Sequence, residues 1–265
     1  IALVTAFRLA GYRPVILTDY DRWMGAYYRE IGVQEHLYWD ECFRQVPMAE
    51  AVQLMASIGS FEQLIKADYC GARVGKYAAS TVLRHLRVGR LDLSDRTVRD
   101  ALLPFLHRAM CYARTAEAIV ETLRPQLVLS VDTGYSPRGE LFDLCLAAGI
   151  DTITWNAAHR NNQLMLKRYS RGNREVHPAS LSASTWGELQ AKPWTEADRN
   201  LLRRELVGSY TSGEWYSEVG TQFHTKLEDP AEVRRTLGLE DGKKTVVVFP
   251  HIFWDGTFFY GTDLF

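Results

Sequence analysis

An excess of charge of one sign is missing from this sequence. Lys and Arg together number 31 and Asp and Glu 32, which gives a formal net charge of −1 over 265 residues. A chain without a strong overall field does not attract nucleic acid or an anionic membrane with its whole surface. We therefore expect no nucleic-acid partner, and we expect any electrostatic function to be local.

Cysteine motifs and long apolar runs are missing as well. The four cysteines, Cys42, Cys70, Cys111 and Cys145, lie far apart, without a CxxC pair or a histidine at metal-ligand spacing. We expect reduced, mostly buried thiols, and no metal site or cofactor. No apolar run approaches the ~20 residues that span a bilayer, and the first residues lack a basic leader and a cleavage site. These absences predict a cytoplasmic protein.

Several enzyme motifs fail on spacing. The stretch "GARVGKY", residues 71–77, has three residues instead of four before its Gly-Lys pair, and Tyr77 stands where a P-loop needs Ser or Thr. No GxGxxG follows a predicted strand, and HExxH and GxSxG are absent. Asp19 and Asp21 match a DxD pattern that holds a metal in some sugar-transferring enzymes, but we interpret Asp21 as the N-cap of the next helix.

The first half of the chain contains alternating helix and strand patterns, followed by helices alone. The composition, 46% hydrophobic and 24% charged, allows one large core or two modest ones. Hydrophobic spacing and glycine stops predict an αβαβ start, with helices at 1–10 and 21–31 and strands at 14–19 and 35–39. Residues 48–124 predict helices only, with Pro104 kinking or dividing the last helix and Pro125 ending it.

The second half predicts a βαβ unit and two capped helices. Strands are expected at 126–132 and 151–156, around a helix with Ser136 as N-cap and Pro137 at its first position. Capping patterns start later helices at Thr195 and Asp229, and Gly238 ends the second of them. Val246–Phe249 has the apolar pattern of a strand buried on both faces of a parallel sheet.

The stretch "SVDTGYSPRGE", residues 130–140, predicts a ligand-binding loop. A buried strand leads to Asp132, Gly134 allows a tight turn, and the N-terminus of the following helix directs free N–H groups at the crevice. Tyr135 and Arg138 favour a phosphate or a polyhydroxylated ligand there. An ordinary βα loop with a capped helix is the alternative.

A basic stretch follows the next predicted strand. Five basic and no acidic residues lie between Arg160 and Arg174, and Asn156 and His159 precede them. They form either a solvated surface or a local anion site for a phosphorylated donor or an acidic glycan. In the second case His159 is a candidate base, because its ordinary pKa of ~6.5 suits proton transfer at neutral pH.

Three stretches together carry a family resemblance: "YSPRGELFDLCLAAGIDTITWN", "LKRYSRGNREVHPASLSASTWGEL" and "KKTVVVFPHIFWDGTFFYGTDLF". They resemble bacterial capsule polysaccharide biosynthesis proteins that are similar to GT-B glycosyltransferases, and the resemblance covers the chain from Gln126 onward. It implies two facing Rossmann-like domains, with a nucleotide-sugar donor bound mainly by the second and a glycan or lipid-linked acceptor mainly by the first. It leaves open a peripheral association with the inner face of the cytoplasmic membrane.

The resemblance also implies a division of the chain. Residues 1–240 would form the acceptor-side Rossmann-like domain, with a helical insertion at about 48–124, and residues 241–265 would begin the donor-binding domain. The chain starts at Ile1 without a methionine, so we expect the 265 residues to be a fragment. The resemblance implies that the rest of the donor-binding region is not present, so we expect this fragment to be inactive by itself.

The candidate site residues come from the loop, the basic stretch and the resemblance. Asp132 and His159 are candidate bases that take the proton of an acceptor hydroxyl, while Arg138 or Lys167 eases departure of the donor phosphate. The residues expected to bind substrate are Tyr135, Ser136, Arg138, Gly139, Asn156, Arg160, Lys167, His177, Trp254 and Asp255. Two alternatives remain open, namely a sugar-nucleotide epimerase of GT-B-like fold and a non-catalytic scaffold of a polysaccharide assembly complex.

Overall fold

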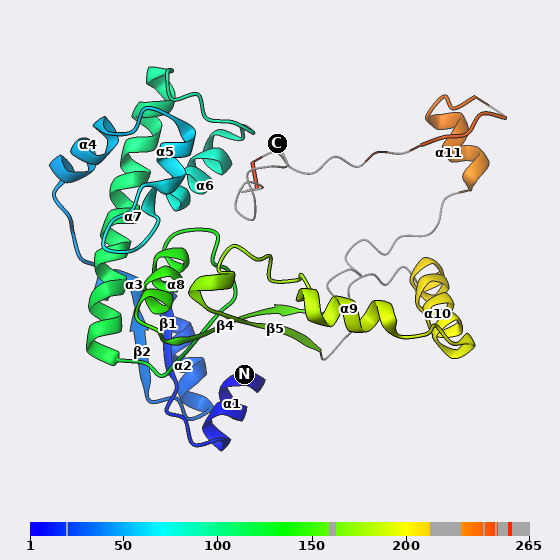
Figure 1. Cartoon of the computed structure of the whole chain (residues 1–265), viewed down its shortest axis with the longest axis horizontal. Helices are drawn as coiled ribbons and strands as arrows, with labels where there is room; N and C mark the ends of the chain where they lie inside the picture. Colours follow the sequence, from blue (N-terminus) through cyan, green and yellow to red (C-terminus); the bar gives the residue numbers. More distant parts are fainter. Residues whose placement is uncertain are drawn as a thin grey trace. The chain divides into compact units, whose positions relative to one another are not determined.

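The computed structural model describes residues 1–19, 21–158, 163–212, 229–240, 242–246, 248 and 254–255 (Figure 1). Contacts between residues divide the chain into two compact units. The first consists of Ile1–Ile153, Tyr169–Glu175 and Phe253–Phe265, and the second of Thr154–Arg168 and Val176–Ile252. The predicted division at residue 240 stays a prediction.

The start of the first unit has the predicted αβαβ order. Its elements are α1 (Ala2–Leu9), β1 (Val15–Thr18), α2 (Arg22–Glu30) and β2 (Glu35–Tyr38). Gly11 and Gly32 follow the two helices with φ of +87° and +83°, a conformation that glycine adopts without strain. Strands β1 and β2 pair in parallel, with Val15 opposite Glu35. Asp21 stands at the N-cap of α2, but its side chain makes no capping hydrogen bond, so the predicted cap is wrong in that respect.

The predicted helical region is confirmed. Its elements, with the short helix before it, are α3 (Trp39–Cys42), α4 (Met48–Ala56), α5 (Phe61–Lys66), α6 (Val74–Leu86) and α7 (Arg96–Leu123). Helix α7 continues through Pro104, so a division there is wrong. Leu102 and Leu106, on either side of the proline, are completely buried. We attribute the continuity to this packing, which offsets the single backbone hydrogen bond that proline removes.

The hydrophobic core of the first unit lies among these helices. Helix α7 packs against α4, α6 and α8, and the buried residues include Leu64, Val74, Val82 and Met110. Gly75 allows α6 to approach α5, because a Cβ at this position would lie 1.9 Å from the carbonyl oxygen of Leu64.

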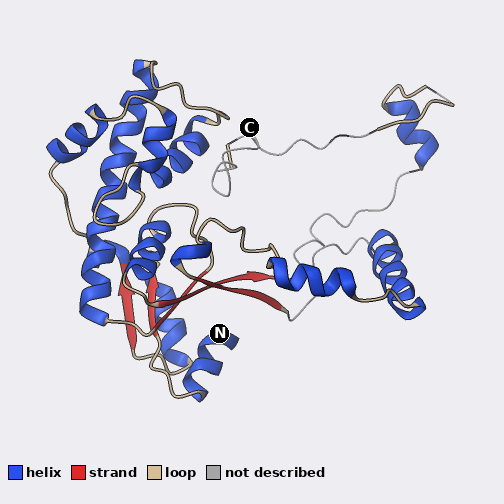
Figure 2. Ribbon diagram, viewed as in Figure 1, coloured by secondary structure: helices blue, strands red, loops and turns tan. Residues whose placement is uncertain are grey.

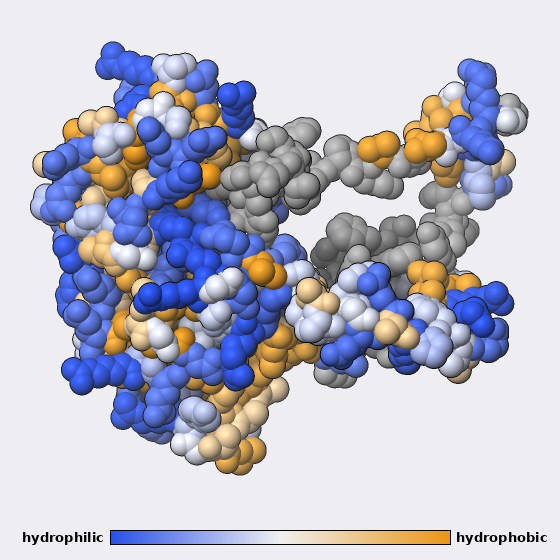
Figure 3. All heavy atoms as spheres, in the orientation of Figure 1, coloured by the Kyte–Doolittle hydropathy of each residue, from blue (hydrophilic) through white to orange (hydrophobic). Residues whose placement is uncertain are grey.

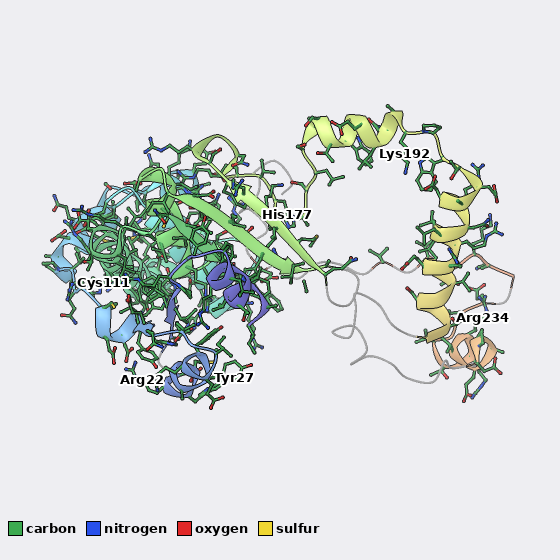
Figure 4. The ribbon with its side chains drawn as sticks, turned by 90° about the horizontal axis from the view of Figure 1, so that it is seen from below. Arg22, Tyr27, Cys111, His177, Lys192 and Arg234 are labelled. Carbon is green, nitrogen blue, oxygen red and sulfur yellow. The ribbon has the colours of Figure 1, made fainter. Side chains whose placement is uncertain are left out.

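The four cysteines differ in how deeply they are buried. Each is a free thiol, as predicted; Cys111 and Cys145 are buried, whereas Cys42 and Cys70 are partly exposed. Cys111 lies among the crowded side chains of the first unit (Figure 4).

The βαβ prediction corresponds to β3 (Leu127–Ser130), α8 (Arg138–Ala147) and β4 (Asp151–Ala157). A further strand, β5 (Leu164–Tyr169), lies in the basic stretch, for which no strand was predicted. It pairs beside β4 in the order β3-β4-β5 (Figure 2). Most of its side chains are exposed, and its sequence LMLKRY lacks the alternation of apolar and polar residues that indicates a half-buried strand.

The α/β class is therefore confirmed, but a single Rossmann-like parallel sheet is not. Among the described residues the strands form two separate sheets, β1-β2 and β3-β4-β5. Val246 and Val248 are 84% and 77% exposed and belong to no strand, so the predicted buried strand at 246–249 is wrong for its two described valines. The reason is that no other described strand pairs with them.

The helices of the second unit are α9 (Ala183–Ala191), α10 (Glu196–Ser212) and α11 (Pro230–Thr236). The short helix η1 (Arg171–Asn173) comes between β5 and α9 in the sequence and belongs to the first unit. The predicted caps are confirmed: Thr195 and Asp198 exchange backbone and side-chain hydrogen bonds, and Asp229 accepts from the amide of Ala231. Helix α9 was not predicted.

Helices α9 and α10 enclose a groove of about 480 Å³ that Trp186, Trp194 and Leu201 help to line. Apolar side chains are exposed along α10 (Figure 3).

Within the part of the chain that the structure describes, no helix has both the length and the apolar character required to cross a membrane.

Candidate functional site

The loop between β3 and α8, residues 131–137, and the first two residues of α8 hold five of the seven predicted site residues of the first unit. Helix α8 begins at Arg138 and its N-cap is Pro137, so the predicted N-cap at Ser136 is wrong. The Ser136 hydroxyl instead donates a hydrogen bond to the carboxyl group of Glu140, one turn into the helix. Ser136 is thereby tied to the interior of the fold and does not cap the helix with its side chain.

Asp132 shapes the turn of this loop. Its Oδ1 accepts a hydrogen bond of 2.8 Å from the Gly134 amide, and its carbonyl oxygen accepts one of 3.3 Å from the Ser130 hydroxyl. The side chain of an aspartate that closes such a turn has a fixed direction. The predicted tight turn at Gly134 is present, and the role of Asp132 as a base stays a prediction.

Arg138 connects the loop to the end of β1. Its Nη2 lies 3.4 Å from Oδ2 of Asp19, the residue that directly follows β1. Both side chains are exposed to solvent. The carboxylate of the DxD pattern is thus paired with an arginine. Among the described residues, no group of three or more His, Cys, Asp and Glu side chains is arranged to hold a metal ion.

Tyr135 lies at the centre of a second polar contact. Its hydroxyl donates to Oδ1 of Asp255 at 3.0 Å, and the Arg84 guanidinium lies 4.8 Å from the centre of its ring. Arg84 also pairs with Asp255 at 3.5 Å. Partial burial, with the Asp255 carboxylate, raises the pKa of Tyr135 to about 12, so the phenol is a hydrogen-bond donor at neutral pH. Trp254 packs against the core of the same unit.

Gly139 and Glu140 lie beneath the loop. A Cβ on Gly139 would lie 2.1 Å from the Tyr77 ring, so this glycine is explained by close packing. Glu140 is completely buried, and burial raises its pKa to about 8, against the hydrogen bond from Ser136. Its Oε2 has no hydrogen-bond partner among the described residues. Glu140 is therefore a neutral acid at neutral pH.

The other predicted site residues lie outside this loop. Lys167 and His177 belong to the second unit, where the Lys167 ammonium donates to the carbonyl oxygens of His177 and Ser180 at 3.0 and 2.6 Å. Nδ1 of His177 accepts from the Ala179 amide. Asn156 is half-buried, in the part of β4 that belongs to the second unit. His159 and Arg160 lie outside the described residues.

The loop and its neighbours can bind a polar ligand. Asp19 and Asp132 present carboxylate oxygens, which accept hydrogen bonds from sugar hydroxyls, while Arg84 and Arg138 present guanidinium groups, which pair with phosphate or carboxylate. Sequence reasoning found Asp132, Tyr135, Arg138 and Asp255 but missed Arg84. A single basic residue at the polar end of a helix gave no signal by itself.

Comparisons with known proteins assign the chain to no family. No protein-family model, curated protein or solved structure matches the chain.

Proposed function

We propose that the protein is a glycosyltransferase of surface, capsular polysaccharide assembly, with a GT-B-like organisation and a cytoplasmic location. It transfers a sugar from a nucleotide-activated donor to a glycan or lipid-linked acceptor. The observation that carries the proposal is the pairing of Arg138 with Asp19, which joins the loop after β3 to the end of β1 in one exposed polar group. Asp19 directly follows β1, and the ligands of α/β folds commonly bind outside the carboxyl ends of the strands.

The proposed reaction places charge where this group can stabilise it. An acceptor hydroxyl attacks the anomeric carbon of the donor, the bond to the nucleotide diphosphate breaks, and the diphosphate leaves with the electron pair of that bond. Asp132 receives the proton of the acceptor hydroxyl, and Arg138 stabilises the negative charge on the leaving phosphate. The Tyr135 hydroxyl remains protonated, keeps its hydrogen bond to Asp255 and accepts one from a ligand hydroxyl.

Replacing Arg138 by glutamine is expected to lower kcat/KM for sugar transfer about 10-fold to 100-fold, because a positive charge beside the leaving phosphate is lost. The assay follows release of nucleoside diphosphate by protein expressed from its complete gene. Arg114→Gln is the matched control, because Arg114 is a comparably exposed arginine paired with Glu117 on α7. Equal rates for Arg138→Gln and the control would argue against the proposed role of Arg138.

Two alternative functions, a sugar-nucleotide epimerase and a non-catalytic scaffold, can be distinguished from a transferase by their reaction products and by the yield of polymer. An epimerase converts the nucleotide sugar without any acceptor, so the mass of the donor stays constant while its stereochemistry changes. A scaffold needs no base, so cells carrying Asp132→Asn produce polymer at the wild-type level. Under the proposed function, Asp132→Asn reduces polymer and acceptor is required for turnover.

A further inference from the structure

Three cationic side chains converge where α6 begins, and the proposed transferase site does not use them. They are Arg73, Lys76 and Arg174, and their side chains are only 13%, 8% and 28% exposed. Two of them belong to the stretch "GARVGKY", which fails as a P-loop by its spacing. Cations are rarely buried to this extent unless they are paired.

One partner of these cations is structural. Asp143 on α8 has a fully buried side chain. Its Oδ2 accepts from the Arg73 amide at 3.0 Å and from Nε of Arg73 at 3.2 Å, while its Oδ1 accepts from Nη2 of Arg174 at 2.9 Å. This carboxylate fixes both guanidinium groups from the interior side.

The other partner is exposed to solvent. Glu175 has a side chain that is 54% exposed, yet it contacts all three cations. Its Oε2 lies 2.8 Å from Nζ of Lys76, and its Oε1 accepts from Arg73 and lies 3.6 Å from Nε of Arg174. One carboxylate on the short turn after η1 therefore covers the solvent side of the cluster.

The cluster retains an unused hydrogen-bond donor on Arg174. Nε of Arg174 is buried and has no hydrogen-bond acceptor among the described residues, since 3.6 Å is too long for a hydrogen bond. Displacement of Glu175 would remove one carboxylate from contact with all three cations. A phosphate monoester carries about −1.5 to −2 at neutral pH and offers three acceptor oxygens.

We propose that Arg73, Lys76 and Arg174 form a binding site for a phosphoryl group, and that Glu175 occupies this site as an internal carboxylate which the phosphoryl group displaces. Asp143 holds the two arginines in position in both states. Glu175 is the member that leaves, because it is the more exposed of the two carboxylates. The site is separate from the loop at Asp132 and does not depend on the proposed transferase function.

Inorganic phosphate is the direct probe, titrated at constant ionic strength while binding is followed by calorimetry and by the midpoint of thermal unfolding. Removing the competing carboxylate with Glu175→Gln is expected to tighten phosphate binding at least about 10-fold, because the ligand no longer displaces an ion pair. Adding Lys76→Gln to that variant is expected to weaken binding again by a similar factor. The control is Glu117→Gln, which removes a carboxylate paired at the same distance of 2.8 Å with Arg114.

The wild-type protein gives a second measurement that does not require a stable variant. Phosphate should raise its unfolding midpoint saturably, above the effect of chloride at equal ionic strength. Equal phosphate affinity for wild type, Glu175→Gln and Glu117→Gln, together with no saturable rise in wild type, would overturn the site. The phosphoryl group can come from a sugar phosphate or from free phosphate, and glucose 1-phosphate distinguishes the two. Tighter binding of glucose 1-phosphate than of inorganic phosphate assigns the site to a sugar-linked phosphoryl group. Equal binding assigns it to free phosphate. Both of these outcomes support the site.

Discussion

Replacing Asp143 by alanine is expected to lower the free energy of unfolding by about 3 kcal/mol, the lower end of the range for breaking a buried ion pair. Asp143 is buried and accepts hydrogen bonds from both Arg73 and Arg174. Its truncation leaves two guanidinium groups short of a partner in a region with little access to water. Glu175 still contacts them, which keeps the loss from being larger.

Denaturation in urea, followed by far-ultraviolet circular dichroism, measures this loss. The control is Asp100→Ala on α7, where an exposed carboxylate pairs with the exposed Arg96 at 3.5 Å. Exposed pairs of this kind contribute about 0–1 kcal/mol, so the control should change stability by less than about 0.5 kcal/mol. Equal and small losses for the two variants would show that the buried network does not stabilise the fold.

Glu140 is expected to make the protein less stable as pH rises toward 8. Burial raises its pKa from 4.5 to about 8 in the folded state, and the like charge of Asp143 adds to this rise. Between these two pH values the folded chain holds a proton that the unfolded chain has lost. The free energy of unfolding therefore falls by up to about 1.4 kcal/mol for each pH unit. This contribution is fully present below 4.5 and is lost once pH exceeds about 8.

Glu140→Gln should remove that dependence, because the amide carries no titrating proton. Its buried NH2 group lacks partners, so the variant is expected to be less stable than wild type at low pH by about 1–3 kcal/mol. The measurement compares the slope of unfolding free energy against pH, from about pH 5 to about pH 8, for wild type, Glu140→Gln and the exposed control Glu121→Gln. Parallel slopes for all three proteins would contradict a buried neutral acid at this position.

The sequence predicted elements whose signals are local. The glycine stops at Gly11 and Gly32, and the caps at Thr195 and Asp229, depend on residues within one or two turns, and the structure has all four. Helix α9 and strand β5 were not predicted, because their mostly exposed side chains show no clear hydrophobic periodicity.

The buried ionic network could not be predicted in the same way. Arg73 and Asp143 are 70 residues apart in sequence, and Arg73 and Glu175 are 102 apart. Packing of α6 against α8 brings Arg73 to Asp143, and the turn after η1 places Glu175 against Arg73. One signal was available: Glu140 and Asp143 are acidic residues in the otherwise apolar stretch of α8, and buried acids imply partners elsewhere in the chain.

The candidate loop was predicted better than its surroundings. Local sequence patterns predict the turn at Gly134, the start of the helix near Arg138 and a polar side chain at Tyr135. They do not predict the contacts of Arg138 with Asp19 and of Tyr135 with Asp255, because these join residues that are 119 and 120 positions apart. Such contacts depend on the fold, which local patterns do not specify. The predicted roles of these residues stay predictions until ligand binding is measured.

Calorimetric titration with a panel of nucleotide sugars, using protein expressed from its complete gene, tests the central claim most directly. The proposed function predicts saturable binding of at least one nucleotide sugar, tighter than the binding of the free nucleoside. Failure of every nucleotide sugar in the panel to bind would contradict it.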